Sequence, residues 1–295
     1  MKRRGRTLFA LMYLAPAVLL YAGLVIWPLI KAFRLSLFAT RGLSARETFV
    51  GLKNYETLFA DEGFRNALTN NLKLLVGVVV IIVVLGLILA HVAETKGPAG
   101  KVMRSIYLFP HVISIVVVGI LWQFLLNPTM GPLTSLLGAV GLRRENGWLG
   151  DSSTALGSVG AAFIWYSIGF YIMLFAAALR GIPEDVVEAA ELDGASGLRR
   201  FRTITWPMIW SVRKVVVIHV VISLLNTFAL VKVMTNSGPA MASDVTLTFL
   251  YRQGFEQSKL GYATTVAVVN FAIVMILAGI IMLIFRKDPQ AARSR

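Results

Sequence analysis

Long apolar stretches without a charged residue recur along the chain and predict its secondary structure. Six windows lack Asp, Glu, Lys and Arg. Each is long enough for a helix of ~20 residues to cross a bilayer, the second and fifth only with their flanking residues. A charge at the bilayer centre is costly, so such windows mark membrane spans. We therefore predict six transmembrane helices, at approximately residues 8–30, 74–93, 105–126, 153–179, 213–234 and 260–285.

The basic segment before the first window resembles the start of a signal peptide. The apolar run that follows is too long for the core of a signal peptide, and no clear small-x-small cleavage site comes after it. We therefore interpret residues 8–30 as a retained span. The sequence shows no internal repeat and no long linker, so residues 1–295 are expected to form a single transmembrane domain.

Composition supports a membrane protein. Hydrophobic residues make up 57% of the 295 positions, charged residues only 15%, and the mean hydropathy is +0.72. Soluble domains carry about 25% charged residues. The composition excludes a disordered chain and an ordinary cytosolic enzyme, and it favours an all-α polytopic membrane protein. The chain has no cysteine, which excludes disulfides, thiolate metal sites and a cysteine nucleophile.

The net charge of +14 would suggest nucleic-acid binding in a soluble protein, but membrane topology explains it better here. With six spans both termini lie on one side, and the segments on that side carry 17 of the 29 basic residues. Cytoplasmic loops are enriched in Lys and Arg, so we expect both termini to be cytoplasmic. The three longer loops would then face the outside, at residues 31–73, 127–152 and 232–259.

The chain lacks an energy source of its own. It contains no G-x-x-x-x-G-K-[ST] phosphate loop, and none of the charge-free windows offers the carboxylate that a proton- or ion-coupled carrier usually keeps. His111 and His219 fall within windows, and we interpret them as interhelical hydrogen bonders rather than proton relays. A secondary carrier and a membrane-bound enzyme remain alternatives, but no paired catalytic acids or H-E-x-x-H support the latter.

The loop at residues 180–207 predicts a helix–turn–helix. Pro183 followed by two acids is typical of a helix start, and Gly194 is expected to end that helix. A second short helix would follow and end at Pro207. Such a loop can pack on its own bundle or lie on the lipid surface, but five acids in the first helix argue against anionic lipid.

This loop resembles the E-A-A-x-x-D-G-A loop of binding-protein-dependent ABC importer permeases. The matching residues are Glu188, Ala189, Ala190, Asp193, Gly194 and Ala195, followed by Phe201, Ile204 and Pro207. Other segments are similar to the sugar-permease, maltose-type branch of that family. They are Phe49–Tyr55, the pattern from Pro110 to Asn127-Pro128, Thr235–Pro239 and Gly261–Ala263.

The resemblance implies a type I ABC importer permease fold in the cell (inner) membrane. The E-A-A loop would form a coupling helix that docks on a cytoplasmic ATPase, with Glu188 paired to a basic residue of that subunit. The partners would be a second permease, an ATPase dimer and an extracytoplasmic solute-binding protein. The first span would wrap the partner permease. This chain would hold no cofactor and catalyse no reaction, because ATP and Mg would bind to the ATPase.

Several residues are candidates for the solute pathway. Trp165 and Tyr166 lie in the middle of the fourth window, and Asn226 and Asn270 lie near the middle of the fifth and sixth. Aromatic residues usually gather at the membrane interfaces instead. The two asparagines either join neighbouring helices or line a polar, aromatic-walled cavity suited to a sugar.

The resemblance also implies sugar contacts at Tyr166, Ser167, Phe170 and Thr227. Phe163 and Leu224 fall where the maltose permease carries asparagines, so maltose itself is not implied. Within the family, glycerol phosphodiester-type compounds and amino sugars are rival solutes. A phosphorylated solute would favour a buried arginine near the bilayer midplane, and none is predicted on this chain.

Overall fold

The computed structural model describes residues 3–40, 47–93, 98–142, 144 and 146–286. The regular secondary structure of the described residues is helical except for one short antiparallel pair, β1 (Phe38–Ala39) with β2 (Thr48–Phe49). Parts of the basic segments that predict the orientation lie outside the described residues. The chain forms two compact units. Unit 1 comprises Met1–Asp61 and Leu250–Phe271, and unit 2 comprises Glu62–Phe249 and Ala272–Arg295.

Unit 1 begins with a long helical segment made of α1 (Arg3–Tyr21), the π-helical η1 (Ala22–Ile26) and α2 (Trp27–Leu35). The apolar stretch Met12–Leu35 is not buried in the structure. The remaining elements of the unit are β1, β2, α3 (Lys53–Ala60), η3 (Arg252–Glu256) and the first part of α16 (Leu260–Ile284). At Gly261 a Cβ atom would come within 2.0 Å of the Phe38 carbonyl oxygen, so this position requires glycine.

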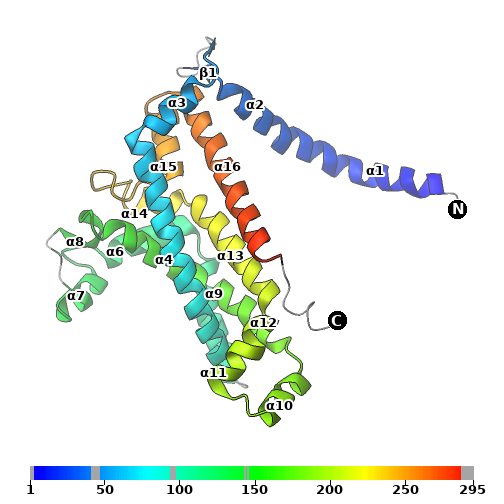
Figure 1. Ribbon diagram of the computed structural model, residues 1–295. Coiled ribbons are helices and arrows are strands. Elements are labelled where there is room, and N and C mark those ends of the chain that lie inside the picture. Colours follow the sequence, from blue (N-terminus) through cyan, green and yellow to red (C-terminus); the bar gives the residue numbers. More distant parts are fainter. Residues whose placement is uncertain (1–2, 41–46, 94–97, 143, 145, 287–295) are drawn as a thin grey trace. The chain divides into compact units, whose positions relative to one another are not determined.

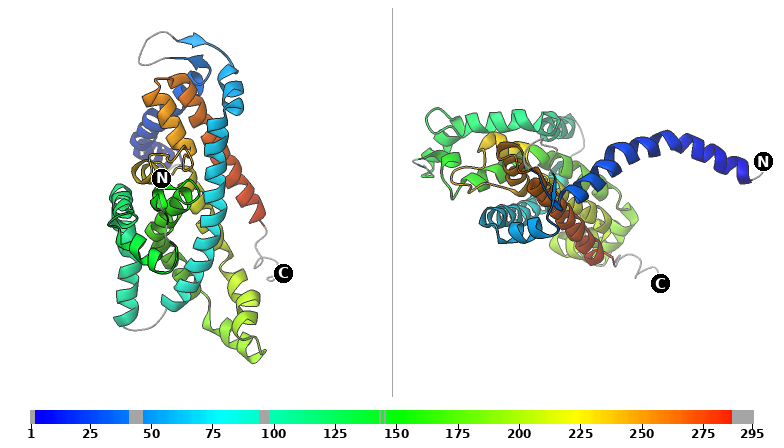
Figure 2. Two further views of the ribbon diagram at one scale, coloured as in Figure 1. Left: turned by 90° about the vertical axis from the view of Figure 1, so that its left-hand side faces the viewer. Right: turned by 90° about the horizontal axis from the view of Figure 1, so that it is seen from above.

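Unit 2 contains the remaining helices. They are α4 (Glu62–Ala93), α5 (Pro98–Val112), α6 (Ile115–Leu125), α7 (Pro132–Ala139), α8 (Gly147–Gly150), α9 (Ala155–Arg180), α10 (Glu184–Leu192), α11 (Gly197–Arg200), η2 (Phe201–Thr205), α12 (Trp206–Met208), α13 (Trp210–Leu225), α14 (Ala229–Met234) and most of α15 (Thr246–Tyr251). Helices α4 and α9 pack along each other (Figure 1 and Figure 2). Their shared core includes Ile82, Tyr171 and Phe175, all buried.

Two asparagines on α4 hold the segment that follows α14. Asn70 Nδ2 donates to the carbonyl oxygens of Ala242 (3.0 Å) and Asp244 (2.9 Å). Asn71 Oδ1 accepts from the Thr246 amide at 2.8 Å. Buried amides need such partners, because an unpaired polar group in an apolar environment costs a few kcal/mol. These bonds fix the irregular chain around the predicted T-x-G-G-P-like segment.

Four described helical segments are long and apolar enough to cross a membrane, and two bent pairs raise the number to six. The helices Ala155–Arg180 and Leu260–Ile284 coincide closely with the fourth and sixth windows. Helix α4, which corresponds to the second predicted span, begins at Glu62, well before the predicted residue 74.

The third and fifth predicted spans are each interrupted in the structure. The third is not one straight helix: Ser105–Val112 and Ile115–Leu125 meet at a bend of 105°. The fifth is divided, because α13 ends at Leu225 and α14 begins only at Ala229. A further bend of 72° separates Gly197–Met208 from Trp210–Leu225.

Candidate functional site

The E-A-A loop folds as the helix α10 followed by a tight turn. Gly194 has a φ of +73°, a left-handed conformation that glycine adopts without strain. The Gly194 amide donates to Glu191 O (3.0 Å) and the Ala195 amide to Ala190 O (2.8 Å). This is the Schellman arrangement, which satisfies the last carbonyl groups of a helix. The turn therefore ends α10 where the sequence predicts it.

The residues of the motif divide between two environments. Ala190 and Ala195 are buried, which holds the turn against the rest of the loop. Glu188, Ala189, Asp193 and Gly194 are exposed. Two leucines beside them are also exposed, Leu192 to 90% and Leu198 to 65%. In Figure 1 α10 lies at the lower end of unit 2, away from α6, α7 and α8. The loop thus presents acidic and apolar side chains together, a composition suited to a protein partner.

The loop continues into α13 through a sharp bend around Ile209. The guanidinium carbon of Arg213 lies 3.6 Å from the ring centroid of Trp206 and 5.0 Å from that of Trp210. Arg213 is only 5% exposed, and its buried Nε has no hydrogen-bond partner among the described residues. The Trp210 indole donates to Phe285 O at 3.3 Å. These contacts link the loop to α13 and to the end of α16.

Two predicted pathway residues, Tyr166 and Phe170, belong to one aromatic cluster. The His111 ring lies 5.0 Å from the ring of Tyr166 and stacks on Phe170 at 5.2 Å with an interplanar angle of 16°. Phe170 also contacts His219 at 5.3 Å. Tyr171 Oη and His219 Nδ1 share a hydrogen bond of 3.0 Å between α9 and α13.

The two histidines behave differently. The interpretation of His219 as an interhelical hydrogen bonder is confirmed by its bond to Tyr171. For His111 it stays a prediction, and among the described residues its buried Nδ1 has no hydrogen-bond partner. Sequence reasoning did not place either imidazole beside Phe170. The signal that could have found the contact is the shared helical face of Tyr166 and Phe170, which are four residues apart.

The other pathway candidates on α9 and α13 are more dispersed. Trp165 packs edge-on against Trp122 at 6.2 Å, away from the His111 contact. Ser167 is buried and donates to Phe163 O within its own helix. Asn226 is the residue that ends α13, not a mid-helix residue, and its Nδ2 donates to Ile222 O. Thr227 is buried and donates to Ser223 O.

Asn270 lies on the part of α16 that belongs to unit 1. Its side chain is buried at 5% exposure. Neighbouring residues of the same helix are also buried, Val266 and Val269 among them. The structure therefore describes Asn270 within its own unit only.

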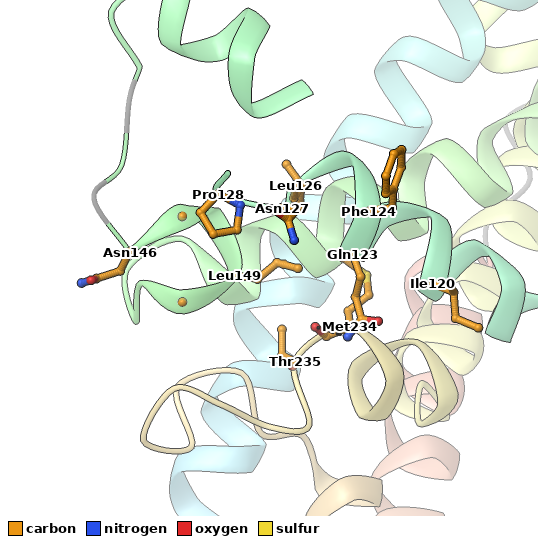
Figure 3. Close-up of a pocket in the computed structure, with 12 residues that line it drawn as sticks. Ile120, Gln123, Phe124, Leu126, Asn127, Pro128, Asn146, Leu149, Met234 and Thr235 are labelled. Carbon is orange, nitrogen blue, oxygen red and sulfur yellow. Dashed lines mark hydrogen bonds between the residues drawn. The ribbon is translucent and has the colours of Figure 1, made fainter. Parts of the chain in front are cut away.

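A cavity of about 620 Å³ lies elsewhere in unit 2 and contains none of the predicted pathway residues (Figure 3). Its walls come from residues 120–128, 146–150 and 234–235. A smaller cavity of about 260 Å³ lies between α4 and α9. In the part of the chain that the structure describes, no group of three or more His, Cys, Asp or Glu side chains could hold a metal ion.

Comparison with known proteins identifies the family. Residues 82–288 match the family described as binding-protein-dependent transport system inner membrane component. The probable ABC transporter permease protein YurN of Bacillus subtilis is 38% identical, over 95% of this chain and 96% of that protein. The diacetylchitobiose uptake system permease protein NgcF of Streptomyces coelicolor is 31% identical, over 95% and 83%.

A solved structure supports the fold. The crystal structure of a bacterial ABC transporter involved in the import of the acidic polysaccharide alginate contains a chain with a TM-score of 0.82. The two chains are 24% identical, and the match covers 96% of each. Fold, motif and family match agree: this chain belongs to the binding-protein-dependent transport system inner membrane components, the permease subunits of ABC importers.

Proposed function

We propose that this chain is one permease subunit of an ATP-driven importer that translocates a carbohydrate by alternating access. The observation that carries the proposal is the E-A-A motif on the exposed helix α10, which leads through α11, η2 and α12 to the bent start of α13. A carbohydrate is favoured because the similar NgcF protein is named for diacetylchitobiose uptake, and an alginate importer shares the fold. Both names describe saccharides.

The proposed partners follow from the family. A second permease would complete the pathway, an ATPase dimer would bind ATP and Mg, and an extracytoplasmic binding protein would deliver the solute. This chain would hold no cofactor and catalyse no reaction, and its sequence contains no phosphate loop. The excess of basic residues on the side of the termini supports cytoplasmic termini in a cell inner membrane.

Tyr166 and Phe170 are the best supported of the proposed pathway residues. Aromatic faces stack on the C–H faces of sugar rings, and the two rings already form part of a cluster with two imidazoles. Trp165 is about one third exposed, and Asn226 is exposed. The Ser167 hydroxyl donates to Phe163 O of α9, and the Thr227 hydroxyl donates to Ser223 O of α13.

The coupling role is tested by two substitutions in the purified, reconstituted transporter. Glu188→Lys reverses an exposed charge, and Gly194→Val places a β-branched residue at a φ of +73°, which distorts the turn. We expect sugar transport per ATP hydrolysed to fall about tenfold or more in both variants, because the loop no longer docks correctly. Both variants should still assemble into the complete complex, as measured by size-exclusion chromatography.

Glu184→Lys is the matched control, since it makes the same charge change at an exposed position of α10 outside the motif. Its transport-to-hydrolysis ratio should stay close to that of the wild type. Normal coupling in both Glu188→Lys and Gly194→Val would refute the assignment of α10 as the coupling helix.

A further inference from the structure

The cavity of about 620 Å³ is built from two sequence motifs that lie far apart in the chain. Asn127-Pro128 follows α6, and Thr235 opens the T-N-S-G-P segment after α14. The third wall is the short helix α8. Gly147, with a φ of +70°, begins that helix, and a Cβ atom there would lie 3.1 Å from the Pro128 ring. The close approach holds α8 against the end of α6.

Two amide side chains of this cavity are held in fixed orientations. Asn127 Oδ1 accepts from the Thr129 amide (3.0 Å), the Thr129 hydroxyl (2.8 Å) and the Met130 amide (3.1 Å). Gln123 Nε2 donates to Val233 O (2.6 Å) and Met234 O (3.3 Å). In the described part of the chain, Asn127 Nδ2 and Gln123 Oε1 have no hydrogen-bond partner. The cavity thus offers one oriented donor and one oriented acceptor.

The side chains around these amides are uncharged. Leu149 and Pro128 supply apolar surface, and Figure 3 shows both beside Asn127. No Asp, Glu, Lys or Arg is among the lining residues. Asp151, which follows α8, accepts from the Ser153 hydroxyl and amide, which hold the pKa of its carboxyl below its usual value. Its other oxygen pairs with Arg144 at 3.6 Å.

We propose that this cavity is a second solute subsite, for a neutral carbohydrate of one or two rings, distinct from the aromatic cluster of Tyr166 and Phe170. A hydroxyl group both donates and accepts, so neighbouring hydroxyls of a sugar satisfy the oriented donor and acceptor together. The volume lies within the range of small-molecule sites, ~300–1,000 Å³. An anionic solute would find no cation here to offset its desolvation.

The subsite rests on the proposed function and specifies where the solute first meets the permease. Asn127 and Thr235 lie in the loops at residues 127–152 and 232–259, which the charge distribution places on the outer side. The binding protein delivers its solute on that side. A sugar released there would bind in the cavity before it moves to residues deeper in the membrane.

The test uses the complete transporter in lipid nanodiscs without its binding protein. Radiolabelled diacetylchitobiose, maltose and trehalose are the neutral probes, and sn-glycerol 3-phosphate is the anionic probe.

Asn127→Asp keeps the Oδ1 acceptor that forms the turn but removes the Nδ2 donor. We expect it to weaken binding of a neutral probe about fivefold, the scale of one hydrogen bond. Leu149→Trp fills the cavity without touching the turn, and it should abolish this binding.

Gln257→Glu is the matched control, because it makes the same amide-to-carboxylate change at an exposed residue that does not line the cavity, and its Oε1 can still accept from Lys259 Nζ. It should bind the neutral probes like the wild type. Equal binding of the neutral probes by Asn127→Asp, Leu149→Trp and the wild type would overturn the subsite. So would a wild-type transporter that binds only the anionic probe, or that binds none of the probes. ATP-driven uptake with the binding protein is measured in parallel. If the wild-type transporter imports a sugar and the cavity variants bind the neutral probes normally, only the subsite is refuted. If the wild-type transporter imports no sugar, the carbohydrate function itself is refuted.

Discussion

The two bent helix pairs of unit 2 are held by different kinds of contact. The α5–α6 bend, of 105°, lies at Ser114, and the α12–α13 bend, of 72°, lies at Ile209. Among the residues that the structure describes, no side chain caps either following helix. The direction of each helix after its bend therefore depends on what it packs against.

The α5–α6 bend is fixed by close packing of backbone atoms. At Gly169 on α9, a Cβ atom would lie 1.8 Å from the Tyr107 carbonyl oxygen of α5. Beyond the bend, Gly119 brings α6 against Val233 of α14, where a Cβ atom would meet Cγ1 at 2.8 Å. Gln123 then bonds the carbonyl oxygens at the end of α14. Such contacts leave no room for α5 and α6 to move against their neighbours.

The α12–α13 bend is instead held by a cation between two aromatic rings. Arg213 contacts Trp206 before the bend and Trp210 after it. Cation–π contacts place the cation over the face of the ring and contribute about 0.5–2 kcal/mol each. We infer that the α5–α6 bend, packed against a backbone oxygen, is the stiffer of the two. Under the proposed coupling role, movement of the E-A-A loop would enter the helices at the α12–α13 bend.

The largest expected effect is that of Gly169→Ala on the α5–α6 bend. The added methyl group meets a backbone oxygen that cannot rotate away, so α5 and α9 must separate. We expect the free energy of unfolding to fall by at least about 3 kcal/mol, the upper part of the range for overpacking. Thermal unfolding and size-exclusion chromatography of the purified complex would measure it.

Gly157→Ala on the same helix is the matched control, because nothing lies within 4 Å of its added Cβ. It should be neutral or slightly stabilising, since alanine favours helix by up to about 1 kcal/mol over glycine. If the two variants unfold at the same temperature, the α5–α6 bend is not fixed by this contact.

A smaller effect is expected at Gly119, where the obstacle is a side chain. Gly119→Ala should cost about 1–2 kcal/mol, because Val233 can give way only in part. Adding Val233→Ala makes room for the new methyl group, so the double variant should be more stable than the sum of the two single changes predicts. Strict additivity in thermal unfolding would show that α6 and α14 do not meet at this point.

Sequence reasoning located the helices better than their bends. Charge-free windows found Ala155–Arg180 and Leu260–Ile284, because burial in a membrane excludes charges along a whole helix. The turn at Gly194 was predictable because a helix end needs a residue that tolerates positive φ. Both signals are local in sequence.

The bends and the cavity depend on contacts between distant residues. Gly169 meets Tyr107, and Gln123 reaches Val233, across separations that no local pattern encodes. Asn226 was predicted at mid-helix, but α13 ends there, since an apolar window does not show where a helix stops within it. The cavity at Asn127 and Thr235 was missed for the same reason: its walls come from three separate segments.

The smallest effect on stability, and the sharpest test of the comparison, is expected at Arg213. Arg213→Met removes two cation–π contacts but also a buried Nε that has no hydrogen-bond partner, so the two changes largely offset each other. We expect the free energy of unfolding to change by about 1 kcal/mol or less. The amount of sugar transported per ATP hydrolysed should nevertheless fall in Arg213→Met, because α13 no longer follows the loop. Arg213→Lys keeps the positive charge and should retain part of the wild-type ratio. Arg202→Met, at an exposed position of η2, is the matched control and should leave the ratio unchanged. A normal ratio in Arg213→Met would mean that movement enters the bundle by another route.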